Sequence, residues 1–161
     1  LHIRGDTTKK QFFLDDLEVT PYLREQDVAD AASKISTYAE VRDVLKQLQR
    51  SFGHAHDAIF CGRDMGSVIF PDADLKIYLT AQPLVRAERR YNELKATHPH
   101  LQSSLSVIDI AKEIEERDAR DQNRNIAPLK PASDAYIIDT SNMSITAVVD
   151  EILSLWNKKK I

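Results

Sequence analysis

Two hydrophobic patterns alternate along this chain. Short apolar runs bounded by turn residues, typical of buried parallel strands, occur at 58–61, 75–79 and 135–139. Apolar residues at helical spacing predict helices over 28–35, 39–52, 82–96, 106–122 and 144–158, with a loop at 53–57. Strands that alternate with helices predict a doubly wound α/β sheet.

The first nineteen residues follow a different pattern. Leu1–Arg4 and Gln11–Leu14 read as short strands, and Leu17–Val19 reads as a third. Gly5 and Asp6 supply a turn between the first two. Because short turns join antiparallel neighbours, we expect a small antiparallel meander here.

Composition excludes several classes of function. The formal net charge is −3 with both signs mixed, so no basic field favours nucleic acid. No apolar stretch approaches the roughly 20 residues of a membrane span. The single cysteine, Cys61, suits a reducing compartment, and its apolar surroundings predict a buried thiol. We therefore expect a cytoplasmic protein.

Candidate chemistry begins at the segment Gly62–Gly66, which carries Arg63 and Asp64 directly after the expected strand 58–61. Ligands in open α/β sheets bind beyond the carboxyl ends of strands, and two glycines permit a tight turn there. The segment is therefore expected to bind an anionic ligand. The alternative is a surface loop with a local ion pair.

A second candidate is the charged helix that contains Arg117, Asp121 and Arg124. Spacings of four and seven residues place these three side chains on one helix face. Two guanidinium groups that flank a carboxylate suit a phosphate. Considered alone, a solvated face with weak ion pairs is the commoner outcome for such a helix.

A third charged cluster, Arg86, Arg89 and Arg90, opens the helix expected at 82–96. Arginine-bearing helices joined by a loop-like tip, here residues 97–104, are typical of the lids of phosphotransferases. A solvated helix is again the alternative. Two His-x-His pairs, at 54–56 and 98–100, lie in expected loops without cysteine or acidic ligands of suitable pattern, so no structural metal site is expected.

Taken in order, the motifs resemble those of the bacterial-type cytidylate kinases along essentially the whole chain. The stretches that carry this resemblance are Gly62–Pro71, Glu116–Asp118, Asp121 to Arg124, Ala127–Leu129, Asp134–Thr140 and Met143–Ile145. The resemblance implies a P-loop nucleoside monophosphate kinase-like fold. That fold is α/β, a parallel sheet with helices on both faces plus a small antiparallel insert that binds the nucleoside monophosphate (NMP).

In this interpretation, residues 1–57 form the CMP-binding insert and residues 58–161 the remaining kinase core, with a lid at about 82–122. The implied activity is phosphoryl transfer from ATP to CMP or dCMP, with Mg²⁺ as the cofactor. The complete protein is expected to be a monomer. Kinases for another nucleoside monophosphate and a non-catalytic nucleotide-binding module remain as alternatives.

The resemblance also assigns roles to individual residues. Contact with cytosine is implied for two helical positions, Ser33 and Arg42, and reading of the base for Asp64. The arginines implied to hold the acceptor phosphate are Arg63, Arg117 and Arg124, and Asp121 is implied to bind the sugar hydroxyls; the lid arginines near the ATP phosphates are Arg86, Arg89 and Arg90. Serine, arginine and carboxylate groups match the donors and acceptors of cytosine.

One family feature is missing from the sequence. No segment matches Gly-x-x-x-x-Gly-Lys-Ser/Thr, the phosphate-binding loop (P-loop) whose amides cradle ATP and whose hydroxyl holds magnesium. Since Leu1 is not an initiator methionine, we expect the chain to begin after the family's first strand and P-loop. The expected ligands of Mg²⁺ lie in that loop. The 161 residues alone are therefore expected to be inactive.

Overall fold

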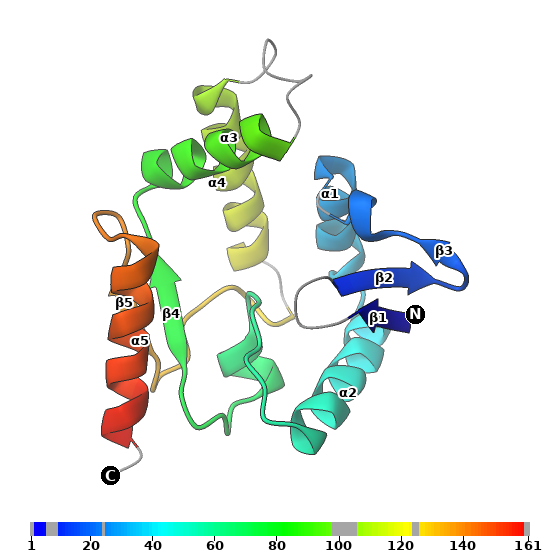
Figure 1. Cartoon of the computed structure of the whole chain (residues 1–161). Coiled ribbons are helices and arrows are strands. Elements are labelled where there is room, and N and C mark those ends of the chain that lie inside the picture. The colour runs from blue at the N-terminus through cyan, green and yellow to red at the C-terminus, as the bar shows by residue number, and fades with distance from the viewer. Residues whose placement is uncertain (1, 6–9, 24, 98–105, 124–125, 160–161) are drawn as a thin grey trace. The chain divides into compact units, whose positions relative to one another are not determined.

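The computed structural model describes residues 2–5, 10–23, 25–97, 106–123 and 126–159 (Figure 1). Its contacts define two compact units, Leu1–Val44 and Leu45–Ile161. The division falls inside α2 (Ala39–Ala55). The functional boundary expected between 57 and 58 stays a prediction.

The first unit contains the expected antiparallel meander. Its strands are β1 (His2–Gly5), β2 (Lys10–Leu14) and β3 (Leu17–Glu18), paired in that order. The turn between β2 and β3 consists of Asp15 and Asp16, and Asp15 has a φ of 52°, as tight hairpin turns often require. A 3-10 turn, η1 (Thr20–Tyr22), then leads to α1 (Gln26–Ile35).

The second unit contains a parallel strand pair. Strands β4 (Ile77–Thr80) and β5 (Tyr136–Asp139) pair from Ile77 opposite Tyr136 to Thr80 opposite Asp139, which confirms the predicted parallel arrangement. The three helices of this unit that follow β4 or β5 are α3 (Pro83–Thr97), α4 (Val107–Asn123) and α5 (Ile145–Lys159). Helix α3 packs against α4, and α5 runs back in the direction opposite to β5 (Figure 1).

The buried apolar core is small among the residues that the structure describes. Its members come from the π-helical turn η2 (Met65–Ile69), α3, α4, the segment after α4, and β5: Ile69, Ala87, Ile110, Ala127 and Ile138. Leu79 and Ile137 on the two strands stay 53% and 64% exposed. Parallel strands become buried when other elements cover both faces, so coverage of both faces by helices remains a prediction. None of the described helices is long and apolar enough to cross a membrane.

Three local expectations were wrong. The run 58–61 forms no strand, because no described strand pairs with it, and Ile59 is 97% exposed. Cys61 is consequently exposed instead of buried. The loop expected at 53–57 begins later, since α2 continues to Ala55. Gly53 lies inside this helix, where it faces the ring of Phe70.

Candidate active site

The segment Gly62–Gly66 leads into one turn of π-helix, η2 (Met65–Ile69), which is tied to α2. Arg50 of α2 donates from Nε to the carbonyl oxygen of Ile69 at 2.7 Å and from Nη2 to that of Val68 at 3.1 Å. These bonds satisfy carbonyl groups at the end of a short helical turn. Arg63 therefore lies just before a helical turn that is bonded to α2, and not at the end of a strand as the sequence predicts.

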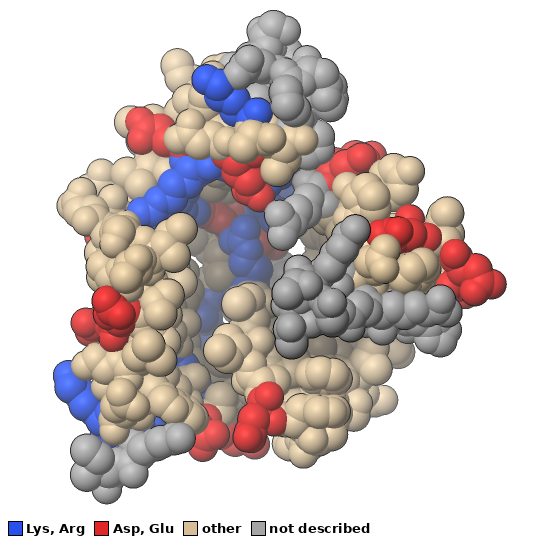
Figure 2. Space-filling view, in the orientation of Figure 1, with Lys and Arg blue, Asp and Glu red and all other residues tan. Residues whose placement is uncertain are grey.

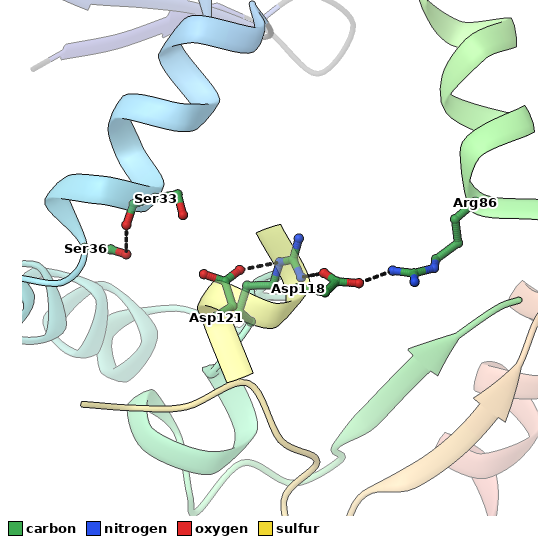
Figure 3. Close-up of polar contacts among 6 residues, drawn as sticks. Ser33, Ser36, Arg86, Asp118 and Asp121 are labelled. Carbon is green, nitrogen blue, oxygen red and sulfur yellow. Dashed lines mark hydrogen bonds and ion pairs between the residues drawn. The ribbon is translucent and has the colours of Figure 1, made fainter. Parts of the chain in front are cut away.

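Asp118 of α4 joins two arginines that are distant in sequence. Its Oδ1 accepts a hydrogen bond from Nη1 of Arg63 at 2.5 Å. Its Oδ2 accepts from Nη1 of Arg86, which reaches it from α3 (Figure 3). Each carboxylate oxygen therefore holds one guanidinium, and both bonds are of the charge-assisted, strong kind.

Asp121 adds a second carboxylate one helical turn further along α4. Its Oδ2 lies 3.6 Å from Nε of Arg63. The side chains of Asp118 and Asp121 are only 14% and 5% exposed, whereas those of Arg63 and Arg86 are 36% and 34% exposed. The carboxylates thus lie beneath guanidinium groups that a solvent-borne anion can reach.

Two opposing effects act on the pKa of Asp118. Burial raises the pKa, but hydrogen bonds from Arg86 and Arg63, together with their positive charges, outweigh burial and lower it below its usual value. Asp118 is therefore ionised at neutral pH. A permanent negative charge at this point holds the two arginines together.

Arg117 also lies on α4. Like Ile114, one helical turn earlier, it is half-buried. Its Nε, like that of Arg86, is buried and has no hydrogen-bond partner among the described residues. A buried guanidinium donor without a partner is costly, so both atoms are suited to receive an acceptor oxygen. Arg124, expected on the same face, lies outside the described residues.

The remaining lid candidates make contacts within the same unit. Arg89 donates from Nη1 to Oγ1 of Thr140 at 2.9 Å, and Arg90 donates to Glu93 on its own helix at 2.9 Å. Basic side chains gather over α3 and the adjoining end of β4 (Figure 2). The expected lid tip at 97–104 lies outside the described residues except for Thr97.

Ser33 and Arg42 belong to the first unit. Ser33 is buried in α1, and its carbonyl oxygen accepts a hydrogen bond from the Ser36 hydroxyl at 2.7 Å (Figure 3). Arg42 donates to the Ser36 carbonyl oxygen at 3.4 Å. Asp64, in the second unit, is buried and precedes η2. Contact of these three side chains with cytosine stays a prediction.

Asp118 is the residue that the sequence interpretation missed. The face drawn through Arg117, Asp121 and Arg124 follows spacings of four and three, and Asp118 lies three residues before Asp121. That spacing alone places both carboxylates side by side on α4. It could have identified Asp118, but its partnership with Arg86 depends on the packing of α3 against α4.

The fold and the site define a mixed α/β protein with a parallel strand pair. In its site, the carboxylates of Asp118 and Asp121 hold the guanidinium groups of Arg63 and Arg86. A family model described as cytidylate kinase matches residues 1–158. The chain belongs to the cytidylate kinase family.

Curated relatives agree with this assignment. The chain is 48% identical over 141 residues to a cytidylate kinase of Nitrosococcus oceani. The matched region covers 88% of this chain and 60% of that protein. It is 42% identical over 149 residues to a cytidylate kinase of Dichelobacter nodosus, covering 92% of this chain and 65% of that protein. The chain thus spans about three fifths of the length of the relatives it matches.

Proposed function

We propose that this chain is the acceptor-binding and lid part of a cytidylate kinase, which transfers the γ-phosphoryl group of ATP to CMP or dCMP. The observation that carries the proposal is the convergence of Arg63 and Arg86 on Asp118, beside Asp121. Family membership supplies the reaction type, because the relatives are named cytidylate kinases.

Positioning and charge stabilisation are the chemistry that such a site supports. Phosphoryl transfer needs little covalent help from a protein, and it requires neutralised phosphate oxygens held in line. Arg63, with Arg117 and Arg124, would hold the acceptor phosphate, while Asp121 would bind the sugar. Arg86 would stabilise charge on the transferring group, together with Arg89 and Arg90. The Nε donors of Arg86 and Arg117, which have no partner in the described part of the chain, support this assignment, since they offer hydrogen bonds to phosphate oxygens.

Magnesium is the cofactor proposed for this reaction, and it usually binds through one or two protein ligands together with substrate phosphates. Among the described residues, no group of three or more histidine, cysteine, aspartate or glutamate side chains is arranged to hold a metal ion. The two carboxylates closest to the arginines already bind guanidinium groups. We propose that Mg²⁺ enters with ATP and that its protein ligands lie in the P-loop.

The proposal is tested with two purified proteins, this 161-residue chain and the full-length product of the gene that encodes it. ADP formation is measured with ATP and each of CMP, dCMP, UMP and AMP. We expect turnover with CMP or dCMP by the full-length product and none by the isolated chain, which has no Gly-x-x-x-x-Gly-Lys-Ser/Thr sequence.

Other outcomes select the alternatives. Preference for UMP or AMP would indicate a different monophosphate kinase. Binding of CMP without turnover by the full-length product would indicate a non-catalytic nucleotide-binding module. Robust CMP-dependent ADP formation by the isolated chain would disprove its inactivity alone.

A further inference from the structure

We propose that Asp118 is a positioning residue, which fixes the orientations of Arg63 and Arg86 together and so couples helix α3 to the acceptor side of the site. This inference rests on the function proposed above. It adds a residue to which the sequence interpretation gave no role, and it links two arginines that were assigned to separate substrates.

The connectivity supports this inference. Asp118 lies on α4, Arg63 precedes η2, and Arg86 lies on α3, so three separate elements meet at one carboxylate. The Arg63 contact spans 55 positions of the chain and the Arg86 contact spans 32. A carboxylate with two oxygens can fix two guanidinium groups at once, one on each oxygen.

The charges and the burial of these side chains suit the Asp118 cluster to bind an anion as well as to stabilise the fold. Asp118 and Asp121 together balance the charges of Arg63 and Arg86, so an anion would be bound through the exposed guanidinium groups and not through a net positive charge. The side chain of Asp118 is 14% exposed, whereas those of its arginine partners are about one third exposed. The positive groups are therefore more accessible to solvent than the negative group that holds them. Arg86 also keeps its buried Nε donor without a partner among the described residues. Both arginines are thus held in place while retaining donors for a ligand.

A purely structural ion pair is the competing explanation. Such a pair would lower stability when broken but would leave catalysis unchanged at temperatures well below unfolding. A positioning role instead changes how productively bound CMP reacts, because small displacements of catalytic groups slow a reaction strongly. The two explanations therefore differ in kinetics measured on folded protein.

The experiment uses the full-length product with four variants: Asp118→Asn, Asp118→Glu, Arg86→Gln, and the double variant of Asp118→Asn with Arg86→Gln. Glu113→Gln, an exposed acidic position on the same helix, is the charge-matched control. Steady-state kinetics for CMP and for ATP are measured below the Tm of the least stable variant.

We expect Asp118→Asn to lower kcat/KM for CMP by about 10- to 100-fold while the KM for ATP is kept. Asp118→Glu should recover part of the loss, and the double variant should be no worse than the poorer single variant, because the two side chains act as one unit. Glu113→Gln should match the wild type.

An active wild type with an equally active, merely less stable Asp118→Asn variant would overturn the positioning role alone. Additive effects of the two single variants in the double variant would overturn the coupling through Asp118. An inactive wild type would overturn the proposed function, and this inference with it.

Discussion

Arg89 of α3 binds Thr140 at the carboxyl end of β5 through both of its terminal nitrogens. Nη1 donates to the Thr140 hydroxyl at 2.9 Å, and Nη2 donates to the Thr140 carbonyl oxygen at 2.5 Å. The Thr140 hydroxyl in turn donates to the Thr80 carbonyl oxygen at 3.0 Å, at the end of β4. The Arg89 guanidinium thereby links α3 to β5 directly and to β4 through the Thr140 hydroxyl.

Arg89→Lys is expected to lower the free energy of unfolding by about 1 kcal/mol. Lysine keeps the charge but cannot present two parallel donors to the buried Thr140. Urea unfolding followed by circular dichroism measures the change. Lys112→Gln, which breaks an exposed 4.0 Å pair with Glu116 on α4, is the control and should change stability by less than about 0.5 kcal/mol. Equal effects of the two variants would show that the Thr140 contact adds nothing.

Helices were the most predictable part of this fold. The expected range 106–122 became α4 (Val107–Asn123) and the range 144–158 became α5 (Ile145–Lys159), since helical spacing is a local signal. The expected strand at 58–61 failed for the opposite reason. Four apolar residues form a strand only when another strand supplies hydrogen bonds, and none of the described strands pairs with this run.

Gly53 shows a second limit of sequence patterns. A Cβ built at Gly53 would lie 2.5 Å from Cε1 of Phe70 and 3.3 Å from Cε2 of Phe60. These rings belong to an aromatic group in which the Phe60 and Phe70 centroids are 4.4 Å apart. Gly53 is therefore a point of close approach within α2, and glycine gave no hint of this in the sequence.

Gly53→Ala is expected to destabilise the protein by about 1–3 kcal/mol. On an open helix surface this change gains roughly 1 kcal/mol from helix propensity, but here it forces the Phe70 ring to move. Thermal unfolding compares it with Ser51→Ala, a change at an exposed position of the same helix. A higher Tm for Gly53→Ala than for wild type would show that the aromatic group yields without cost.

The candidate site was only partly readable from sequence. The i, i+4 pattern drew attention to Asp121, which is buried beside Arg63 as a functional carboxylate would be. The spacing of three between Asp118 and Asp121 could have added Asp118 to this face, but a helix face says nothing about which arginines arrive from other elements. Arg86 and Arg63 reach Asp118 through tertiary packing alone.

Lys76 and Asp134 form a bridge between the segments that precede β4 and β5. Lys76 Nζ donates to the two carboxylate oxygens of Asp134 at 2.9 and 2.7 Å, and also to the carbonyl oxygen of Pro71. The hydrogen bond from Lys76 lowers the pKa of Asp134 below its ordinary value of 3.8. Asp134 is thus bound more tightly when ionised.

This bridge predicts a pH dependence of stability. A folded-state pKa below the unfolded value stabilises the protein above the unfolded value, and the contribution is lost as pH falls through the folded pKa. We therefore expect Asp134→Asn to lower the Tm at pH 7. The difference from wild type should begin to shrink below about pH 4, near the unfolded pKa, and it should be lost as pH falls through the lower folded pKa of Asp134.

Thermal scans from pH 7 to about pH 3 measure this difference. Asp72→Asn, an exposed change in the turn before β4, is the control and should keep a Tm close to wild type at pH 7. A Tm difference for Asp134→Asn that stays constant across the whole range would show that ionisation of Asp134 does not stabilise the fold.

Arg63 is the site residue at which charge and geometry can be separated. Its Nη1 and Nε face two different carboxylates, Asp118 and Asp121, so its planar fork is held in one orientation. Arg63→Lys keeps the positive charge but replaces the fork by a single ammonium group. In the full-length product, kcat/KM for CMP should fall by about 10- to 100-fold.

The KM for ATP should change little in this variant, because the proposed role of Arg63 concerns the acceptor phosphate. Lys95→Gln, an exposed change on α3, serves as the control for loss of one basic side chain in the same unit. Both proteins are assayed by CMP-dependent ADP formation. If Arg63→Lys matches wild type in kcat/KM for CMP, the positive charge alone suffices and the fork held by Asp118 and Asp121 has no part in binding the acceptor phosphate.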